Sequence, residues 1–403
     1  MSKILITGNG FDLFHHLPTK YGHFMAIMKT IENVEFKKQI AFEELFEGYF
    51  KDEFDRDFNS IVENYNTDNI KFDNAKINEL QLLLKDNNWY HYFRTILEVD
   101  TWIDFEIEVE NILKQLSILL KSETPQSKKV NYYRDIPINY FDFNLFGIIE
   151  HKLEDKELFS IIDKYVDKRA LGIKSVHVLS DLSIAFENFT IIFNRYLVDV
   201  VGIFYNHKKN NQIIPLLLIN EIYTFNYTPT LEKLYNIDKS KVVYLHGEMH
   251  EDSEKQNLVF GVNEITQDLK IAKAYDFTKY YQKIKKNSNK KFIEIPTNAK
   301  RGLDETIFYV MGHSLDQSDK EYVTDLFKFL EFDSDAYSKI CIFYHSTHDR
   351  EHKLKNLFNI IDKKVIIEMN KTGRLYFSEL TINNVEEEFS KKLYFKADSY
   401  DIR

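Results

Sequence analysis

The first thirteen residues contain the feature that most restricts how this chain folds. The short apolar run Ile4–Ile6 predicts a buried strand of a parallel sheet. It is followed by Gly8-Asn9-Gly10, where the backbone turns sharply and approaches a ligand without obstructing side chains. Exposed amides in such a turn, with a helix behind it, favour phosphate oxygens, so the sequence predicts a nucleotide or dinucleotide site here. Because Leu13 stands where the dinucleotide fingerprint has its third glycine, an ordinary tight turn is the alternative.

Composition excludes several classes of protein. The 403 residues are 44% apolar and carry a net charge of −10, which argues against a general nucleic-acid binder. The single cysteine, Cys341, excludes an internal disulfide framework and a multi-cysteine zinc site. Apolar runs such as 213–219 are much shorter than the roughly 20 residues of a membrane helix, and the first run is too short for a signal peptide. We therefore expect a globular, soluble, cytoplasmic protein with no membrane contact.

Hydrophobic spacing changes along the chain. Between about residues 24 and 210 it is helical, and the candidate helices are Ala41–Phe50, Lys76–Leu84, Asp104–Leu120, Leu153–Tyr165 and Ser180–Leu197. After Pro215 short apolar runs alternate with polar segments, and the candidate strands are Leu217–Thr224, Val242–Leu245, Leu258–Phe260, Thr306–Met311 and Ile340–Tyr344. Near the carboxyl end, Val365–Met369 and Arg374–Leu380 predict a hairpin at the sheet edge, turning at Lys371-Thr372-Gly373.

This alternation predicts an α/β protein with an open, Rossmann-like, mainly parallel sheet. Residues 1–24 and 211–403 would form the core, and residues 25–210 a large, mainly helical insertion. In an open α/β sheet the ligand lies outside the carboxyl ends of the strands. The residues that fall at or near predicted strand ends include Gly8, Gly10, Gly247, Gly261 and Gly312. We therefore expect the functional site at this edge of the sheet.

Three further strand ends carry polar side chains. The amide of Asn226 suits the orientation of a water or a ribose hydroxyl, or it forms a turn or a helix cap. His246 is placed for general-base work near neutral pH, or it is a satisfied polar residue. The turn at Gly312 could present amides and Ser314 to a ribose or a phosphate, or it is an ordinary strand–loop boundary.

Taken in order, these motifs resemble those of the sirtuin-like NAD-binding fold. The matching segments are Gly8-Asn9-Gly10 for its Gly-Ala-Gly, Thr224-Phe225-Asn226 for its Asn motif, Leu245-His246-Gly247 for its Leu-His-Gly, and Gly312-His313-Ser314 for its late Gly-Thr-Ser. Over most of its length the chain more closely resembles the phage abortive-infection AbiH family. The segments that carry this second resemblance are Gly8-Asn9-Gly10-Phe11-Asp12-Leu13, Leu17-Pro18-Thr19 and Trp102-x-Asp104-x-Glu106.

These resemblances imply an NAD site in which NAD is the substrate and no further cofactor or metal is required. They assign catalytic roles to Asn226, at the water or ribose, and to His246, at the ribose hydroxyls. Gly8, Asn9 and Gly10 would hold the pyrophosphate. The remaining implied binding residues are Phe11, Asp12, Thr224, Gly247, Gly312 and Ser314. Asp12 would lie near the ribosyl cation, or it would cap the first helix.

The chain also departs from the sirtuin pattern. Thr228 stands where the Asn motif has an aspartate, and Lys20-Tyr21 replaces a Phe-Arg pair. One cysteine cannot supply the four-cysteine zinc of deacylating sirtuins. These differences argue against protein deacylation and leave room for hydrolysis of NAD itself.

Other charged segments have two interpretations each. Asp104 and Glu106 are two residues apart and do not share a helix face, so one would cap a helix while the other points at the cleft. The basic, tyrosine-containing run 279–301 is interpreted as a solvated helix and loop rather than a nucleic-acid patch. His345, His348 and His352 have metal-ligand spacing without a nearby acidic pattern, so we predict no metal there.

The leading hypothesis is a phage-defence effector that hydrolyses NAD to nicotinamide and ADP-ribose. One alternative is a sensor that binds NAD or ADP-ribose without turnover, because the departures at Tyr21 and Thr228 have disabled catalysis. A second alternative is a nuclease whose basic run binds nucleic acid and whose Asp and Glu residues hold a metal. The expected partners are NAD, a phage-derived trigger and a second copy of the chain. The helical insertion would then be an autoinhibitory, sensing or oligomerising element.

Overall fold

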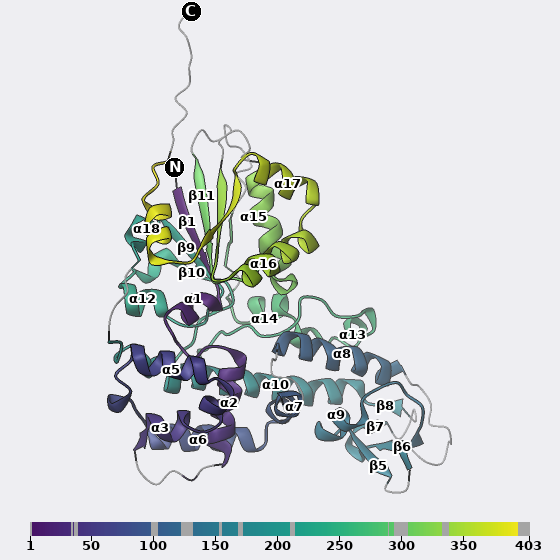
Figure 1. Cartoon of the computed structure of the whole chain (residues 1–403). Helices are drawn as coiled ribbons and strands as arrows, with labels where there is room; N and C mark the ends of the chain where they lie inside the picture. Colours follow the sequence, from purple (N-terminus) through teal and green to yellow (C-terminus); the bar gives the residue numbers. More distant parts are fainter. Residues whose placement is uncertain are drawn as a thin grey trace, which may run out of the picture.

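A six-stranded parallel sheet forms the centre of the fold (Figure 1). The computed structural model describes residues 2–33, 35, 39–97, 104–121, 132–152, 155–167, 172–209, 214–288, 290–293, 305–332 and 338–393. The strands of the sheet are β1 (Ser2–Thr7), β9 (Glu221–Thr224), β10 (Val242–Tyr244), β11 (Thr306–Met311), β12 (Lys339–Tyr344) and β13 (Leu375–Glu379). Central strands are buried on both faces, as all six residues of β11 are, which is why they appear in the sequence as continuous apolar runs.

The strand order is β10-β9-β1-β11-β12-β13, with every pair parallel. Counted along the chain, the six strands therefore lie in the order 3-2-1-4-5-6 of a Rossmann sheet. The first strand pairs with two strands far away in sequence, since Leu5 lies beside Ile222 on one side and Tyr309 on the other. The predicted α/β Rossmann-like fold is confirmed.

Helices cover both faces of this sheet. One face packs against α15 (Lys320–Phe332), α16 (Thr347–Ile360) and α17 (Lys363–Lys371), through residues such as Phe327, Leu357 and Ile366. The other face packs against α1 (Asn9–Phe14), α12 (Thr230–Tyr235) and α18 (Ile382–Ser390), through Phe11 and Phe389 among others. The result is a three-layer arrangement in which the carboxyl ends of the strands remain free for other contacts.

A helical layer lies below those carboxyl ends, as Figure 1 shows. Its helices are α2 (Tyr21–Asn33), α3 (Phe42–Phe46), α4 (Tyr49–Glu53), α5 (Asp55–Asn64), α6 (Asn74–Lys85), α7 (Asn88–Leu97), α8 (Phe105–Lys121), α9 (Tyr140–Leu145), α10 (Ser175–Tyr196) and α11 (Gly202–Phe204). They share one hydrophobic cluster with apolar residues between Leu258 and Phe277, a segment that also contains α13 (Gln267–Ile271) and precedes α14 (Lys279–Lys285). The segment between β10 and β11 thus completes the helical core.

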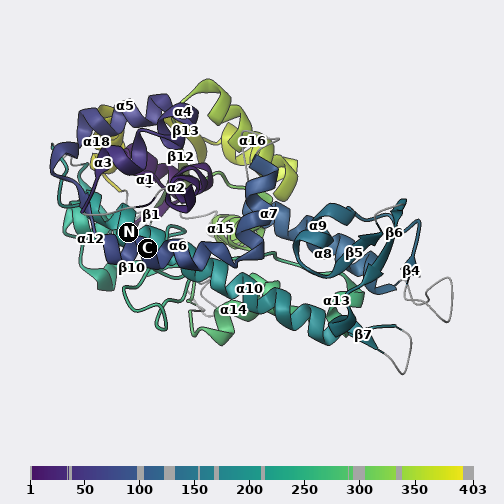
Figure 2. The ribbon, with the colours of Figure 1, turned by 90° about the horizontal axis from the view of Figure 1, so that it is seen from below.

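The helical layer also contains short antiparallel strands. They are β2 (Ile40–Ala41) with β3 (Lys71–Phe72), β4 (Tyr132–Tyr133) and β5 (Ile149–Lys152) with β6 (Asp155–Ile161), and β7 (Val166–Asp167) with β8 (Gly172–Ile173). Figures 1 and 2 place β5, β6 and β7 at the end of α10 that lies away from the parallel sheet. This part of the insertion is therefore remote from the strand ends.

Three predicted elements are wrong. The helix predicted at 153–165 is the strand β6 over Asp155–Ile161, followed by a single 3₁₀ turn, while residues 153 and 154 lie outside the described residues. Phe159 and Ile161 are buried with the two-residue period of a strand. The segment Leu258–Phe260 forms no strand, because its backbone amides instead bond to the side chains of Gln256 and Gln282 and to the carbonyl of His246.

The predicted carboxyl-terminal hairpin is the third error. Residues 365–369 belong to α17, whose Ile366 and Met369 are three apart and pack on the sheet. Gly373 has a φ of +71° and ends this helix, and the chain then enters β13 parallel to β12. A glycine turn that looked like a hairpin loop is a helix terminus.

Most of the other predicted elements are present with shifted ends. The strand predicted over Leu217–Thr224 is shorter, because Leu216–Leu218 forms a 3₁₀ turn before β9. The helix predicted over Ala41–Phe50 is broken at Gly48 into α3 and α4. Within the described residues one continuous helical stretch, Ser175–Phe204, is long and apolar enough to cross a membrane by length and composition. Its Phe186, Phe189 and Phe193 are buried in the helical core, as in a core helix of a soluble protein.

Candidate active site at the strand ends

A cavity of about 330 Å³ lies between the carboxyl edge of the sheet and the helical layer. Loops after β1, β9, β10 and β11 form one wall, and α2, α8 and α10 contribute the opposite wall. Its lining is Gly8, Asn9, Gly10, Asp12, Thr19, Tyr21, Asp104, Glu106, Phe193, Leu197, Phe225, Asn226, Tyr227, Thr228, His246, Gly312, His313, Ser314, Ser318 and Asp319. The cavity therefore sits at the carboxyl ends of the adjacent strands β1 and β11, where the strand order reverses, and this switch point is where Rossmann sheets bind ligands.

The structure brings most of the predicted site residues together at this cavity. Its lining includes Gly8, Asn9, Gly10, Asp12, Asn226, His246, Gly312 and Ser314, which four separate segments supply. Three predicted binding residues do not line it. Phe11 is buried against the sheet face that α1, α12 and α18 cover. The hydroxyl of Thr224 accepts a hydrogen bond from the backbone amide of Asn226. Gly247 packs against Asn257.

The glycines allow the first and fourth strand-end loops to touch. A Cβ on Gly10 would lie 2.7 Å from the Cα of Gly312, and one on Gly8 would lie 2.8 Å from the Cα of His313. Gly312 has a φ of +72°, and a Cβ there would lie 2.1 Å from the amide nitrogen of Phe11. The close approach of two backbones, rather than of backbone to ligand, therefore explains these glycines.

Three backbone amides of this turn already donate hydrogen bonds within the protein. Gly8 donates to the carbonyl of Met311, Gly10 donates to the carbonyl of Gly312 at 2.8 Å, and Phe11 donates to the carbonyl of Gly8. The expectation that this turn offers a row of free amides to phosphate is wrong for these three. Asn9, at the tip of the turn, is exposed beside the cavity.

Asp12 joins the first loop to the second. Its carboxylate accepts hydrogen bonds from the hydroxyls of Thr228 and Thr230, the latter at 2.6 Å. Burial raises the pKa of Asp12 to about 6, although hydrogen bonds from Thr228, Thr230 and Asn226 partly offset this effect. The alternative that Asp12 caps the first helix is wrong, because it lies inside α1 and the cap position is Gly8. Thr228, which departs from the sirtuin pattern, is thus a hydrogen-bond donor to the first loop.

The raised pKa of Asp12 predicts a pH-dependent stability. The pKa of Asp12 is about 6 in the folded protein and 3.8 for an aspartate in the unfolded chain. The folded protein therefore loses stability as the pH rises between these two values. The loss is about 3 kcal/mol, because one pKa unit corresponds to about 1.4 kcal/mol. Asp12→Asn cannot titrate, so its free energy of unfolding should improve relative to wild type by that amount between pH 4 and pH 7. Urea unfolding at stepped pH measures this, and a constant difference would contradict it.

His246 lies at the end of β10 and faces a carboxylate that sequence reasoning did not find. Its Nε2 is 3.1 Å from Oδ1 of Asp319, an ion-pair distance, although the atoms are not aligned for a hydrogen bond. Burial lowers the pKa of His246 to about 4, with attraction to Asp319 acting in the opposite direction. The imidazole is therefore neutral at pH 7 and able to accept a proton.

Asp319 is held by three basic side chains. The backbone amide of Leu315 donates to Nδ1 of His313, so Nε2 of this ring is the nitrogen that donates to Asp319, 3.2 Å away. Lys279 contributes a second contact at 3.5 Å, and His246 the third. Burial alone would raise the pKa of Asp319, but the charge of Lys279 and its histidine neighbours hold that pKa well below its usual range.

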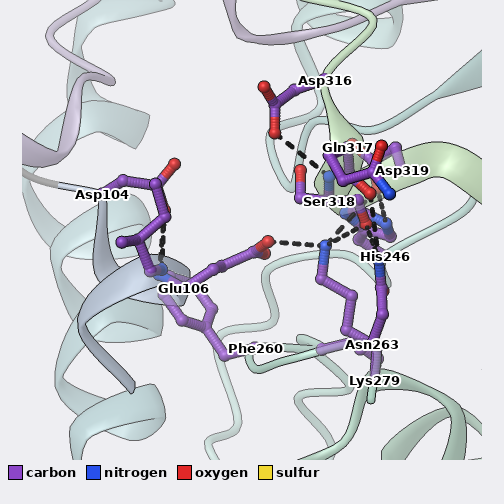
Figure 3. Close-up of polar contacts among 12 residues, drawn as sticks. Asp104, Glu106, His246, Phe260, Asn263, Lys279, Asp316, Gln317, Ser318 and Asp319 are labelled. Atoms are coloured by element: carbon purple, nitrogen blue, oxygen red, sulfur yellow. Dashed lines mark hydrogen bonds and ion pairs between the residues drawn. The ribbon is translucent and has the colours of Figure 1, made fainter. Parts of the chain in front are cut away.

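Figure 3 shows how Lys279 links the two walls of the cavity. Its ammonium lies 2.7 Å from Glu106 of α8, donates to the carbonyl of Ser318, and reaches Asp319. Burial raises the pKa of Glu106 to about 7, and Lys279 lowers it in part. Asp104 instead caps α8 by accepting from the amides of Glu106 and Ile107. The expected division of roles between Asp104 and Glu106 is confirmed, and both line the cavity.

Sequence reasoning missed Asp319 and misjudged Lys279. Asp319 is the last residue of the 3₁₀ turn Gln317–Asp319, which Asp316 caps, and such a pattern is ordinary at the start of a helix. Lys279 was placed in a solvated basic run, yet only 4% of it is exposed. No pattern within the run distinguished Lys279 from exposed neighbours such as Lys285.

The remaining sequence candidates lie elsewhere. His345 is exposed and pairs with Asp349, and within the described part of the chain no group of three or more His, Cys, Asp or Glu side chains is arranged to hold a metal. Trp102, and Lys300 and Arg301 of the basic run, lie outside the described residues.

Comparison with known proteins gives one result that spans most of the chain. No curated protein and no solved structure gives a significant match. The model of the family described as bacteriophage abortive infection AbiH matches residues 4–344, from the first strand through β12. That span includes every residue that lines the cavity. The chain therefore belongs to the bacteriophage abortive infection AbiH family.

Proposed function

We propose that this protein is a phage-defence effector that hydrolyses NAD to nicotinamide and ADP-ribose. The defence role follows from membership of the AbiH family. The observation that carries the proposed chemistry is the cavity at the Rossmann switch point, with Asn226 and His246 delivered to it by two adjacent strands. Such a position is typical of dinucleotide sites.

The chemistry requires few groups. Water adds to C1′ of the nicotinamide ribose, the bond to the pyridinium nitrogen breaks, and its electron pair leaves with a neutral nicotinamide. One proton is released, and the transition state has oxocarbenium character, as in glycoside hydrolysis. Because the leaving group departs neutral, no acid is needed to protonate it. The protein must orient the ribose, position the water and stabilise positive charge.

The cavity contains groups suited to each task. His246, neutral at pH 7 and next to the ionised Asp319, is the base or hydrogen-bond acceptor for a ribose hydroxyl or the water. Asn226, which also bonds to Asp12, orients the ribose or the water. Asn9 and Ser314 are exposed at the glycine end and are the side chains we assign to the pyrophosphate region.

Nicotinamide release tests this function. Purified protein incubated with NAD should release nicotinamide, and Asn226→Ala or His246→Ala should reduce the rate by about 10²-fold or more. Saturable NAD binding without release would favour a sensor instead.

A further inference from the structure

The charges around the cavity are unusual for a site that takes a dinucleotide. Four carboxylates line it, Asp12, Asp104, Glu106 and Asp319, whereas its described lining contains no lysine or arginine. The cation in contact with them is Lys279, which lies behind Glu106 and Asp319 and offsets a single charge. Burial keeps His246 neutral at pH 7, so that ring adds no positive charge. The lining therefore repels anions and attracts cations.

The phosphates of a dinucleotide meet few hydrogen-bond donors and no lysine or arginine side chain in the described lining of this cavity. The amides of Gly8, Gly10 and Phe11 donate to carbonyls within the fold, and the turn leaves no row of donors for phosphate. These three amides are therefore not available to a pyrophosphate, and the ionisable groups that line the carboxylate end of the cavity are acidic.

Aromatic rings stand beside the carboxylates. Tyr21, Phe193, Phe225 and Tyr227 all line the same cavity, and Tyr21 stacks on Phe105 with ring centroids 4.4 Å apart. Aromatic faces attract cations, and more strongly in sites from which water is excluded. Close by, Nε2 of His246 lies 3.1 Å from the Asp319 carboxylate, so the imidazole ring also borders the carboxylate end of the cavity. Flat rings and carboxylates together match a planar aromatic cation.

We propose that this wall selects a ligand whose aromatic ring carries positive charge, so that the cavity prefers the oxidised pyridinium form of the dinucleotide to the reduced, neutral form. The inference rests on the proposed function for the identity of the ligand. Asp104, Glu106 and Asp319 supply the attraction, and hydrolysis removes it, because nicotinamide leaves neutral and the remaining ADP-ribose is purely anionic. The same wall thus favours binding of substrate and release of product.

The test uses a pair of ligands that the protein does not cleave. The carbocyclic analogue of NAD has a methylene in place of the ribose ring oxygen and keeps the pyridinium charge, and its dihydropyridine form has the same skeleton without the charge. Calorimetric titration of the full chain at pH 8, where Glu106 is ionised, should show the oxidised analogue binding at least tenfold more tightly. Asp104→Asn, which keeps an effective helix cap, and Glu106→Gln should each reduce this ratio severalfold.

Glu110→Gln is the matched control, because Glu110 lies one turn further along α8 and pairs with Lys114. It should leave the ratio unchanged. Equal affinity for the two analogues, or no binding of either at millimolar concentration, would overturn the inference. Discrimination between the analogues by a protein that never releases nicotinamide from NAD would instead refute the proposed hydrolysis and leave the charge selectivity standing. Circular dichroism of each variant separates lost folding from lost selectivity.

Discussion

Replacing Lys279 with Met should lower the free energy of unfolding by about 3–5 kcal/mol at pH 8. Lys279 is 4% exposed, and its ammonium is the cation shared by Glu106 and Asp319. Removing one partner of a buried ion pair leaves the other charges without compensation in a medium that solvates them poorly. Because the pKa of Glu106 is about 7, this carboxylate is mostly protonated at pH 6 and then carries no unpaired charge. The decrease in the free energy of unfolding should therefore be smaller at pH 6. Urea unfolding at the two pH values measures both effects.

Lys285→Met provides the control on the same helix. Lys285 pairs with Asp276 at the surface, 3.1 Å apart, and exposed pairs contribute at most about 1 kcal/mol. The double variant Lys279→Met/Glu106→Gln should recover part of the loss, because it removes one of the two unpaired carboxylates. Equal losses for Lys279→Met and Lys285→Met would show that the link between the two walls does not stabilise the fold.

Asp319→Asn should reduce the rate constant of nicotinamide release by about 10²-fold, the lower end of what a positioned general base contributes. Asp319 is a positioning residue, since it contacts His246 and stabilises its protonated form. Loss of its charge should lower the pKa of His246 below about 4, because attraction to Asp319 is the main influence that raises it. The amide oxygen of Asn can still accept from His313, so the loop should remain folded.

Two measurements separate the roles of Asp319. Steady-state kinetics reports turnover, and an NMR titration of the histidine ring reports its pKa without any reaction. Asp319→Glu should restore part of the turnover and part of the His246 pKa. A lower His246 pKa with unchanged turnover would remove His246 from the chemistry, and an unchanged pKa would contradict the influence of Asp319 on His246.

Much of the sheet could be predicted because buried parallel strands leave a local signal. Thr306–Met311 was predicted with both ends as observed, since all six residues are buried and a glycine follows. The strand ends that carry Asn226 and His246 were found for the same reason. Hydrophobic runs alone did not separate strand from helix at 365–369, where residues three apart face the sheet and Gly373 ends a helix.

The contacts that join the carboxylates of the cavity to other segments could not be predicted, because they form between residues distant in sequence. Lys279 and Glu106 are far apart in sequence, and their 2.7 Å contact exists only once α8 lies under the strand ends. The same holds for Asp12 with Thr230. Gly8 and Gly10 were singled out as residues of a strand-end turn, yet their role in allowing two loops to touch depends on Gly312, and no local pattern specifies that contact.

The central claim is that this cavity cleaves NAD, and chromatography of the reaction products tests it most directly. Purified protein, and cells that express it during phage infection, should convert NAD to nicotinamide and ADP-ribose in equal amounts. Asn226→Ala and His246→Ala should slow this by about 10²-fold or more, whereas His345→Ala, at an exposed histidine, should not. Intact NAD in both settings, with NAD merely bound or with nucleic acid degraded in a metal-dependent manner, would contradict the account.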